Sequence, residues 1–66
     1  MAETASAPPI TVVGSSPRGY ARATEAAVCE AARTIRGIRR AEVVSLAAVV
    51  AEDRVVEYRA TVALTL

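Results

Sequence analysis

The strictest constraint on the fold is the alternation of side chains in VVEYRATVALTL, residues 55–66. Every second residue is apolar or aromatic, and this set comprises Val56, Tyr58, Ala60, Val62, Leu64 and Leu66. The intervening set is more polar and comprises Val55, Glu57, Arg59, Thr61, Ala63 and Thr65. Because successive side chains of a strand point to opposite faces, the segment predicts a β-strand with one buried face.

The segment before it predicts the neighbouring strand of a hairpin. Residues 40–50 are rich in Val and Ala, and the polar turn AEDR at residues 51–54 separates them from the alternating segment. A hairpin with a turn of this length pairs Val50 near Val55. In that register Arg59 lies opposite Leu46, Thr61 lies opposite Val44, and Thr65 lies opposite Arg40.

The preceding part of the chain predicts a further strand and one helix. Residues 10–16, ITVVGSS, contain β-branched residues and predict a short strand that ends at Gly14. Ser16 as N-cap and Pro17 at the first helical position predict the start of a helix that Gly37 closes. Apolar and small side chains recur along it at three- and four-residue steps and form one stripe, comprising Tyr20, Ala23, Thr24, Ala27, Val28, Ala31, Ile35 and Ile38.

A chain of 66 residues needs additional stabilisation, and its composition leaves few ways to supply it. So short a chain buries only about 60% of its unfolded surface. Disulfides, a structural metal and oligomerisation are the usual remedies. The single cysteine, Cys29, excludes an internal disulfide, and the absence of histidine excludes a zinc site of the usual Cys/His kind. The composition therefore predicts an oligomer.

The predicted register gives the sheet two different faces. One face suits packing under the helix, and the opposite face carries Arg40, Glu42, Val44, Leu46, Ala48, Val50, Val55, Glu57, Arg59, Thr61, Ala63 and Thr65. One helix cannot cover both faces, and large exposed apolar patches usually mark contact surfaces. We therefore expect the second face, where Arg40 points, to meet a partner subunit or a ligand.

The composition also argues against several functions. There is no histidine, the lone cysteine lacks a base, and no glycine-rich phosphate loop occurs, so we expect no enzyme. The arginines are spread along the chain and balanced by seven acids, which argues against nucleic-acid binding. The sequence shows neither a membrane span nor a signal peptide, so the expected location is the cytoplasm. Residues 1–8 are rich in Ala, Ser and Pro and predict a disordered tail before a domain at residues 9–66.

The order of several short motifs resembles the dodecin family. The motifs are VGSS at the end of the first strand, ARTIRGI at the end of the helix, AEV in the second strand and VVEYRATVALTL in the third, and the match runs over residues 10–66. The resemblance implies an α+β fold in which a three-stranded antiparallel sheet partly wraps one helix, in the order β-α-β-β. It also implies a hollow homododecamer that binds, stores or buffers a small ligand without acting as an enzyme.

The same resemblance points to a flavin site with altered chemistry. Flavin-binding members stack the flavin ring on a Trp early in the second strand, and that position is Arg40 here, followed by Ala41 at a Phe position. The flavin-contacting Gln of the last strand corresponds to Arg59. Aromatic stacking adds about 0.5–1.5 kcal/mol beyond burial, and arginine offers hydrogen-bond donors only. The segment IRRAEV, residues 38–43, is similar to a Trp-less branch described as calcium-binding.

Three interpretations of the site remain open. The two arginines either pair with acids such as Glu42 and Glu57, within or between subunits, or gather by symmetry around a phosphate-bearing ligand such as a nucleotide or coenzyme A. For the binding interpretation the expected cofactor is FMN or riboflavin, and the contact residues are Arg40, Arg59, Val44, Leu46 and Thr61. In the third interpretation, carboxylates on a symmetry axis bind calcium or another cation, with no metal ligand assigned from the sequence.

Overall fold

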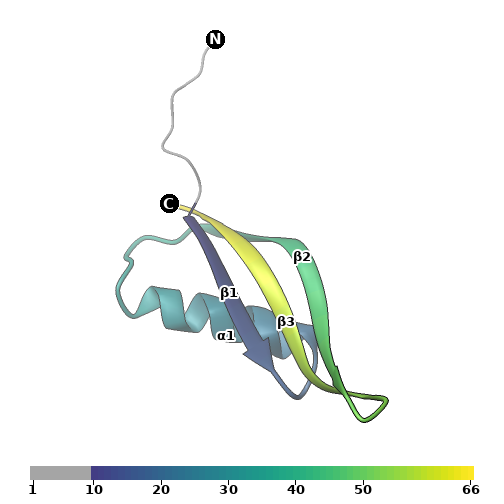
Figure 1. The fold of residues 1–66 in the computed structure, drawn as a ribbon. Helices are drawn as coiled ribbons and strands as arrows, with labels where there is room; N and C mark the ends of the chain where they lie inside the picture. Colours follow the sequence, from purple (N-terminus) through teal and green to yellow (C-terminus); the bar gives the residue numbers. More distant parts are fainter. Residues whose placement is uncertain (1–9) are drawn as a thin grey trace.

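The chain folds into one helix and three strands in the order β-α-β-β (Figure 1). The computed structural model describes residues 10–66, so the predicted tail at residues 1–8 lies outside the described residues. The elements are β1 (Ile10–Ser16), α1 (Tyr20–Ala32), β2 (Arg40–Ala51) and β3 (Arg54–Thr65). The strands form one antiparallel sheet in the order β1-β3-β2. The predicted α+β fold class is therefore confirmed.

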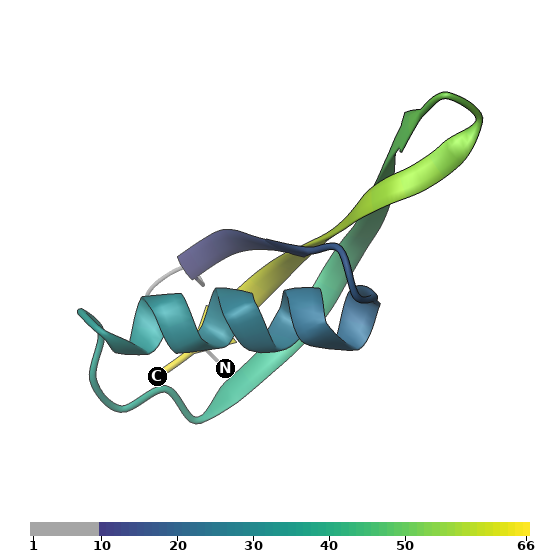
Figure 2. The same cartoon turned by 90° about the horizontal axis from the view of Figure 1, so that it is seen from below.

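The core lies between α1 and the strands β1 and β3 (Figure 2). One helix stripe meets alternate residues of β3, and the buried set comprises Ala23, Ala27, Ala31, Ala60, Val62 and Leu64. Val28 packs against this set from the helix, whereas Ile35 and Ile38, which were predicted to lie on the helix, pack against it from the loop after α1. Only two of the buried side chains are larger than a methyl group, so the core is thin and relies on close approach of helix and sheet.

That close approach depends on Gly14 in β1. A Cβ atom at this position would lie 2.5 Å from the Ala27 amide nitrogen and 2.7 Å from the Ala27 Cβ, and also against the Ala23 carbonyl oxygen. These distances are far inside van der Waals contact, so a side chain there would push the helix off the sheet. The predicted end of the strand at Gly14 is wrong, because β1 continues through Ser16.

The helix is shorter at both ends than predicted. Ser16 remains in β1, and its Oγ accepts a hydrogen bond from the Arg18 backbone N–H at 3.0 Å. Gly19, with φ 143°, occupies the N-cap position without a side-chain cap. The helix ends at Ala32, and Gly37 lies in the following loop at φ 81°. The Ser-Pro pair therefore forms a turn before the helix, and its interpretation as a helix start is wrong.

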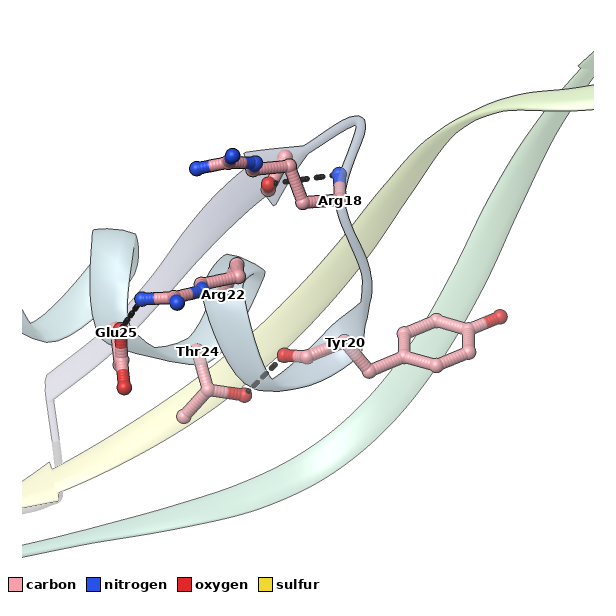
Figure 3. Close-up of polar contacts among 6 residues, drawn as sticks. Arg18, Tyr20, Arg22, Thr24 and Glu25 are labelled. Carbon is pink, nitrogen blue, oxygen red and sulfur yellow. Dashed lines mark hydrogen bonds and ion pairs between the residues drawn. The ribbon is translucent and has the colours of Figure 1, made fainter.

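Local polar contacts link residues in the first turns of α1 (Figure 3). The Thr24 hydroxyl donates to the Tyr20 carbonyl oxygen at 2.9 Å, and the Arg22 guanidinium contacts the Glu25 carboxylate at 3.2 Å. Both members of the ion pair are more than half exposed, so it contributes little to stability. This surface of the helix is polar and adds nothing to the core.

The β2–β3 hairpin agrees with the predicted register at its two ends and departs from it in the middle. The end pairs, Arg40 with Thr65 and Val50 with Val55, are as predicted. Between them the register shifts by one residue, because the ladder skips Val44 in β2 and later skips one residue of β3. Such bulges insert one unpaired residue into a strand. The predicted pairs of Arg59 with Leu46 and of Thr61 with Val44 are therefore wrong, and the observed partners of Arg59 and Thr61 are Ala47 and Ser45.

The turn end of the β2–β3 hairpin extends away from the rest of the fold (Figure 2). Strand β1 pairs with β3 only from Leu64 to Tyr58, so residues 49–57 form a two-stranded ladder that we call the hairpin arm. At the junction the rings of Tyr20 and Tyr58 meet edge to face, with 4.9 Å between centroids and 76° between planes. The remainder of residues 10–66 is called the body.

The tip of the hairpin arm is a two-residue turn. Glu52 and Asp53 have φ values of 52° and 64°, the left-handed pair that a type I′ turn requires. Such turns favour Asn-Gly, because a residue with a Cβ atom pays about 1 kcal/mol for the left-handed conformation. The predicted turn is confirmed, but its residues are not those that suit it best.

Candidate ligand-binding face

The face of the sheet opposite α1, which we call the open face, has no helix over it within residues 10–66 (Figure 2). Its members follow from the register, because directly paired residues share a face. It carries Thr11, Val13 and Ser15 from β1, Arg40, Glu42, Val44, Ser45, Ala47 and Val49 from β2, and Glu57, Arg59, Thr61, Ala63 and Thr65 from β3. The open face thus carries five apolar and nine polar or charged residues, and both arginines of the predicted site lie on it.

Four of the five predicted contact residues lie on the open face, and Leu46 does not. Arg59 and Thr61 are neighbours on one side of β3, and Val44 stands at the bulge opposite Thr61. Leu46 pairs instead with Ala60, which is buried under the helix. The placement of Leu46 beside the arginines is therefore wrong, because the bulge moves it to the helix side, where its side chain is 53% exposed.

An ion pair within β3 holds Arg59. Its Nε–H donates to the Glu57 Oε2 at 2.9 Å. This hydrogen bond is the largest influence on the pKa of Glu57 and lowers it. Desolvation, the second largest, opposes it, and the positive charge of Arg59 and the nearby Ser15 lower the pKa further by smaller amounts. The carboxylate is therefore ionised at neutral pH and neutralises part of the charge that Arg59 offers to a ligand.

Arg40 lies at the other end of the open face. It is exposed, pairs with Thr65 at the sheet edge, and takes part in no ion pair within residues 10–66. Thr65 and Arg59 are six residues apart on β3, and a strand rises about 3.3 Å per residue, so Arg40 and Arg59 of one chain are about 20 Å apart. They do not converge on one phosphate group, and a site that uses both arginines for one phosphate needs two chains.

No metal centre is preformed in the part of the chain that the structure describes. Residues 10–66 contain no group of three or more acidic or cysteine side chains that could hold an ion. A hard cation such as calcium takes six to eight oxygen ligands, so several chains would have to contribute them. The calcium interpretation stays a prediction.

Sequence reasoning missed Ser15, Ser45 and Ala47, which border Arg59 and Thr61 on the open face. Ser15 faces Arg59 because β1 pairs antiparallel with β3 around Val12 and Val62. The signal available in the sequence was the alternation of β1, whose apolar Ile10 and Val12 must share the buried face of β3. The positions of Ser45 and Ala47 depend on the bulge, which the mostly apolar segment VVSLAAVV does not indicate.

The fold and this face together define a small β-α-β-β protein with one helix on one side of a three-stranded antiparallel sheet and an uncovered mixed surface on the other. The family model described as Dodecin matches residues 9–66, and the chain belongs to the dodecin family. Members of this family are oligomeric proteins that bind small ligands, typically flavins, and are generally not enzymes. No curated protein and no solved structure matched the chain significantly. Within residues 10–66, no helix has the length and apolar character needed to cross a membrane.

Proposed function

We propose that the chain assembles as a hollow homododecamer whose open faces bind and store a flavin or another phosphate-bearing cofactor, without catalysis. Family membership supports an oligomer that binds a small ligand. The observation that carries the ligand class is the exposed Arg40 on the open face, at the position of the stacking Trp of flavin-binding members, with no ion-pair partner in residues 10–66.

The chemistry of arginine favours a ligand that has both a planar ring and a phosphate. A guanidinium group stacks on planar rings and donates paired hydrogen bonds to phosphate. Val44 and Thr61 add an apolar and a hydroxyl contact on the same face, with Arg59 beside them. Because Arg40 and Arg59 of one chain lie about 20 Å apart, the arginines that meet at one ligand come from different subunits. FMN therefore suits the site better than riboflavin, which lacks the phosphate.

The first test is native mass spectrometry of the untagged protein, followed by denaturation to release bound molecules. We expect a mass of twelve chains and release of a flavin or nucleotide. Titration of the assembled protein with FMN and riboflavin then tests the role of the phosphate. A monomer, or a dodecamer that binds neither flavin and releases no phosphate-bearing molecule, overturns the proposal.

A matched pair of substitutions tests the role of Arg40. Arg40→Gln removes the charge on the open face, while Arg18→Gln removes an exposed charge from the turn before α1. We expect the first to weaken FMN binding at least tenfold, with a smaller effect on riboflavin, and the second to leave both unchanged. Equal effects of the two variants would mean that general charge, and not a contact, explains the affinity.

One observation favours a second candidate, a flavin-free structural assembly. Arg59 already has an ion-pair partner in Glu57 on its own strand. In this candidate the arginines neutralise acids within and between subunits, and the cage forms without a cofactor. Arg59→Gln would then lower the stability of the dodecamer toward dissociation without affecting FMN affinity. Calcium binding and cytoplasmic location stay predictions.

A further inference from the structure

The hairpin arm, residues 49–57, is uncovered on both faces within residues 10–66. Neither β1 nor α1 extends over it, and Val50, Val55 and Val56 are 61%, 44% and 44% exposed. A two-stranded hairpin is at best marginally stable in water. Three exposed valines within so short a segment indicate a contact surface. The arm therefore requires a surface to lie against.

The body also carries an apolar surface that no other element of residues 10–66 covers. On the helix side of β2, Ala41, Val43, Leu46 and Ala48 pair with the core residues of β3 and Tyr58, but α1 lies over β1 and β3. We call these four residues the β2 strip. Val43 and Leu46 are 43% and 53% exposed. Each copy thus has an unsupported apolar arm and an unoccupied apolar strip.

Charges of opposite sign lie at the two ends of these surfaces. The tip of the arm carries Glu52 and Asp53, and the loop before the β2 strip carries Arg36 and Arg39. None of the four takes part in an ion pair within residues 10–66. Strand β2 separates the two ends by about 36 Å, so one chain cannot bring its own charges together, whereas two chains can.

We propose that the hairpin arm of one copy lies on the β2 strip of a neighbouring copy, with its acidic tip toward Arg36 and Arg39 of that neighbour. A second copy is the occupant because one chain presents both surfaces and both signs of charge. The contact joins different patches of the two copies, and such head-to-tail contacts close into rings when the rotation allows. The inference rests on the proposed assembly and names the surfaces that build it.

Charge reversal with rescue tests the contact. The tip variant carries Glu52→Arg and Asp53→Arg, the loop variant Arg36→Glu and Arg39→Glu, and the rescue variant all four substitutions. We expect each reversal to raise at least tenfold the concentration at which half the protein is assembled, measured by sedimentation and native mass spectrometry at low salt. The rescue variant should return to within threefold of the unmodified chain, because opposite charges face each other again.

Two controls keep the outcome specific. The variant Glu25→Arg with Glu30→Arg makes the same change in charge as the tip variant, but on the outer surface of α1, and should assemble normally. Val50→Ser with Val55→Ser, checked for folding by circular dichroism, should impair assembly in a way that neither rescue by charge nor high salt restores. Independent, additive effects of the tip and loop reversals overturn the inference, as does normal assembly of either one.

The oligomeric state of the unmodified chain distinguishes failure of the proposed assembly from failure of the placement of the arm. If it is a monomer, the proposed assembly fails and the inference with it. If it forms a dodecamer and the tip, loop and valine variants assemble equally well, the proposed function stands and the placement of the arm is wrong.

Discussion

The body and the hairpin arm share strands β2 and β3 and differ in what lies over these strands. Within β3, Leu64, Val62 and Ala60 are at most 1% exposed, whereas Val56 on the same side of the strand is 44% exposed. The alternation of residues is unbroken between them, and Tyr58 marks the change. A period-two pattern therefore specifies which side of a strand is to be buried, and another element or another chain decides whether it is.

The two regions also differ in how they tolerate change. In the body, small residues allow α1 to touch β1, and the fit leaves no space for an added atom at Gly14. The arm has exposed apolar side chains and a tip with two left-handed residues, so local changes there meet few neighbours in the same chain. We therefore expect steric substitutions to act on the body and turn or charge substitutions to act on the arm.

The largest effect should come from Gly14→Ala in the body. The new Cβ atom would collide with the backbone of α1 at Ala23 and Ala27, which cannot move aside like a flexible side chain. We expect a loss of about 3 kcal/mol in the free energy of unfolding, the upper part of the range for overpacked sites. Denaturant unfolding at fixed protein concentration measures it.

Gly37→Ala is the matched control for this substitution. Gly37 has a positive φ of 81°, but no atom lies within 4 Å of an added Cβ. Backbone strain alone should therefore cost about 1 kcal/mol. If the two variants lose the same stability, close packing at Gly14 is not what holds the helix on the sheet.

A smaller effect of opposite sign is expected at the tip of the arm. Replacing Glu52 by Asn and Asp53 by Gly suits the type I′ turn, and should stabilise the arm by about 1 kcal/mol. Slower amide hydrogen exchange in residues 49–57 would show this. Glu52→Gln, which removes a charge without favouring the turn, should not slow the exchange. Faster exchange in the Asn-Gly variant would mean that the tip is held by contacts that the two acids make.

The smallest effect should be the pH dependence that Glu57 contributes at the border of the two regions. Because its pKa is lowered in the folded chain, the carboxylate contributes stability above its ordinary pKa of 4.5, and this is lost as the pH falls through the lowered value. Carboxyl chemical shifts followed by NMR between pH 2 and 6 should show the lowered pKa. In Arg59→Gln the pKa should rise toward the ordinary value, and an unchanged titration would exclude Arg59 as the cause.

The sequence predicted what depends on periodicity and missed what depends on local geometry. The stripe of α1 and the alternation of β3 were sufficient for the fold and for most of the core. The helix start was wrong because Ser16 and Pro17 suit a turn as well as a helix cap, and pairing of Ser16 in β1 decided the matter. The bulge at Val44 was missed because residues 43–50 are apolar except Ser45, so they show no alternation that would reveal a change of face.

The candidate site was predicted less completely than the fold. Arg40, Arg59, Val44 and Thr61 share the open face as expected, because the register is correct at the ends of the hairpin and the bulge keeps Val44 on its side. Leu46 lies beyond the bulge, so a shift of one residue moved it to the other face. The separation of the two arginines along the sheet follows from the same register. The contacts between neighbouring chains could not be predicted in the same way, because the periodicity of one sequence shows which faces are apolar and not which faces meet.

The edge-to-face pair of Tyr20 and Tyr58 has a consequence for optical measurements. The chain contains no Trp and no Phe, so its near-ultraviolet circular dichroism and intrinsic fluorescence come from these two rings, whose centroids are 4.9 Å apart. Both signals therefore report on a single place, where the arm leaves the body. A thermal unfolding curve measured by tyrosine fluorescence will report the separation of the two rings at this junction. Unfolding of the whole chain has to be measured by a backbone signal such as far-ultraviolet circular dichroism.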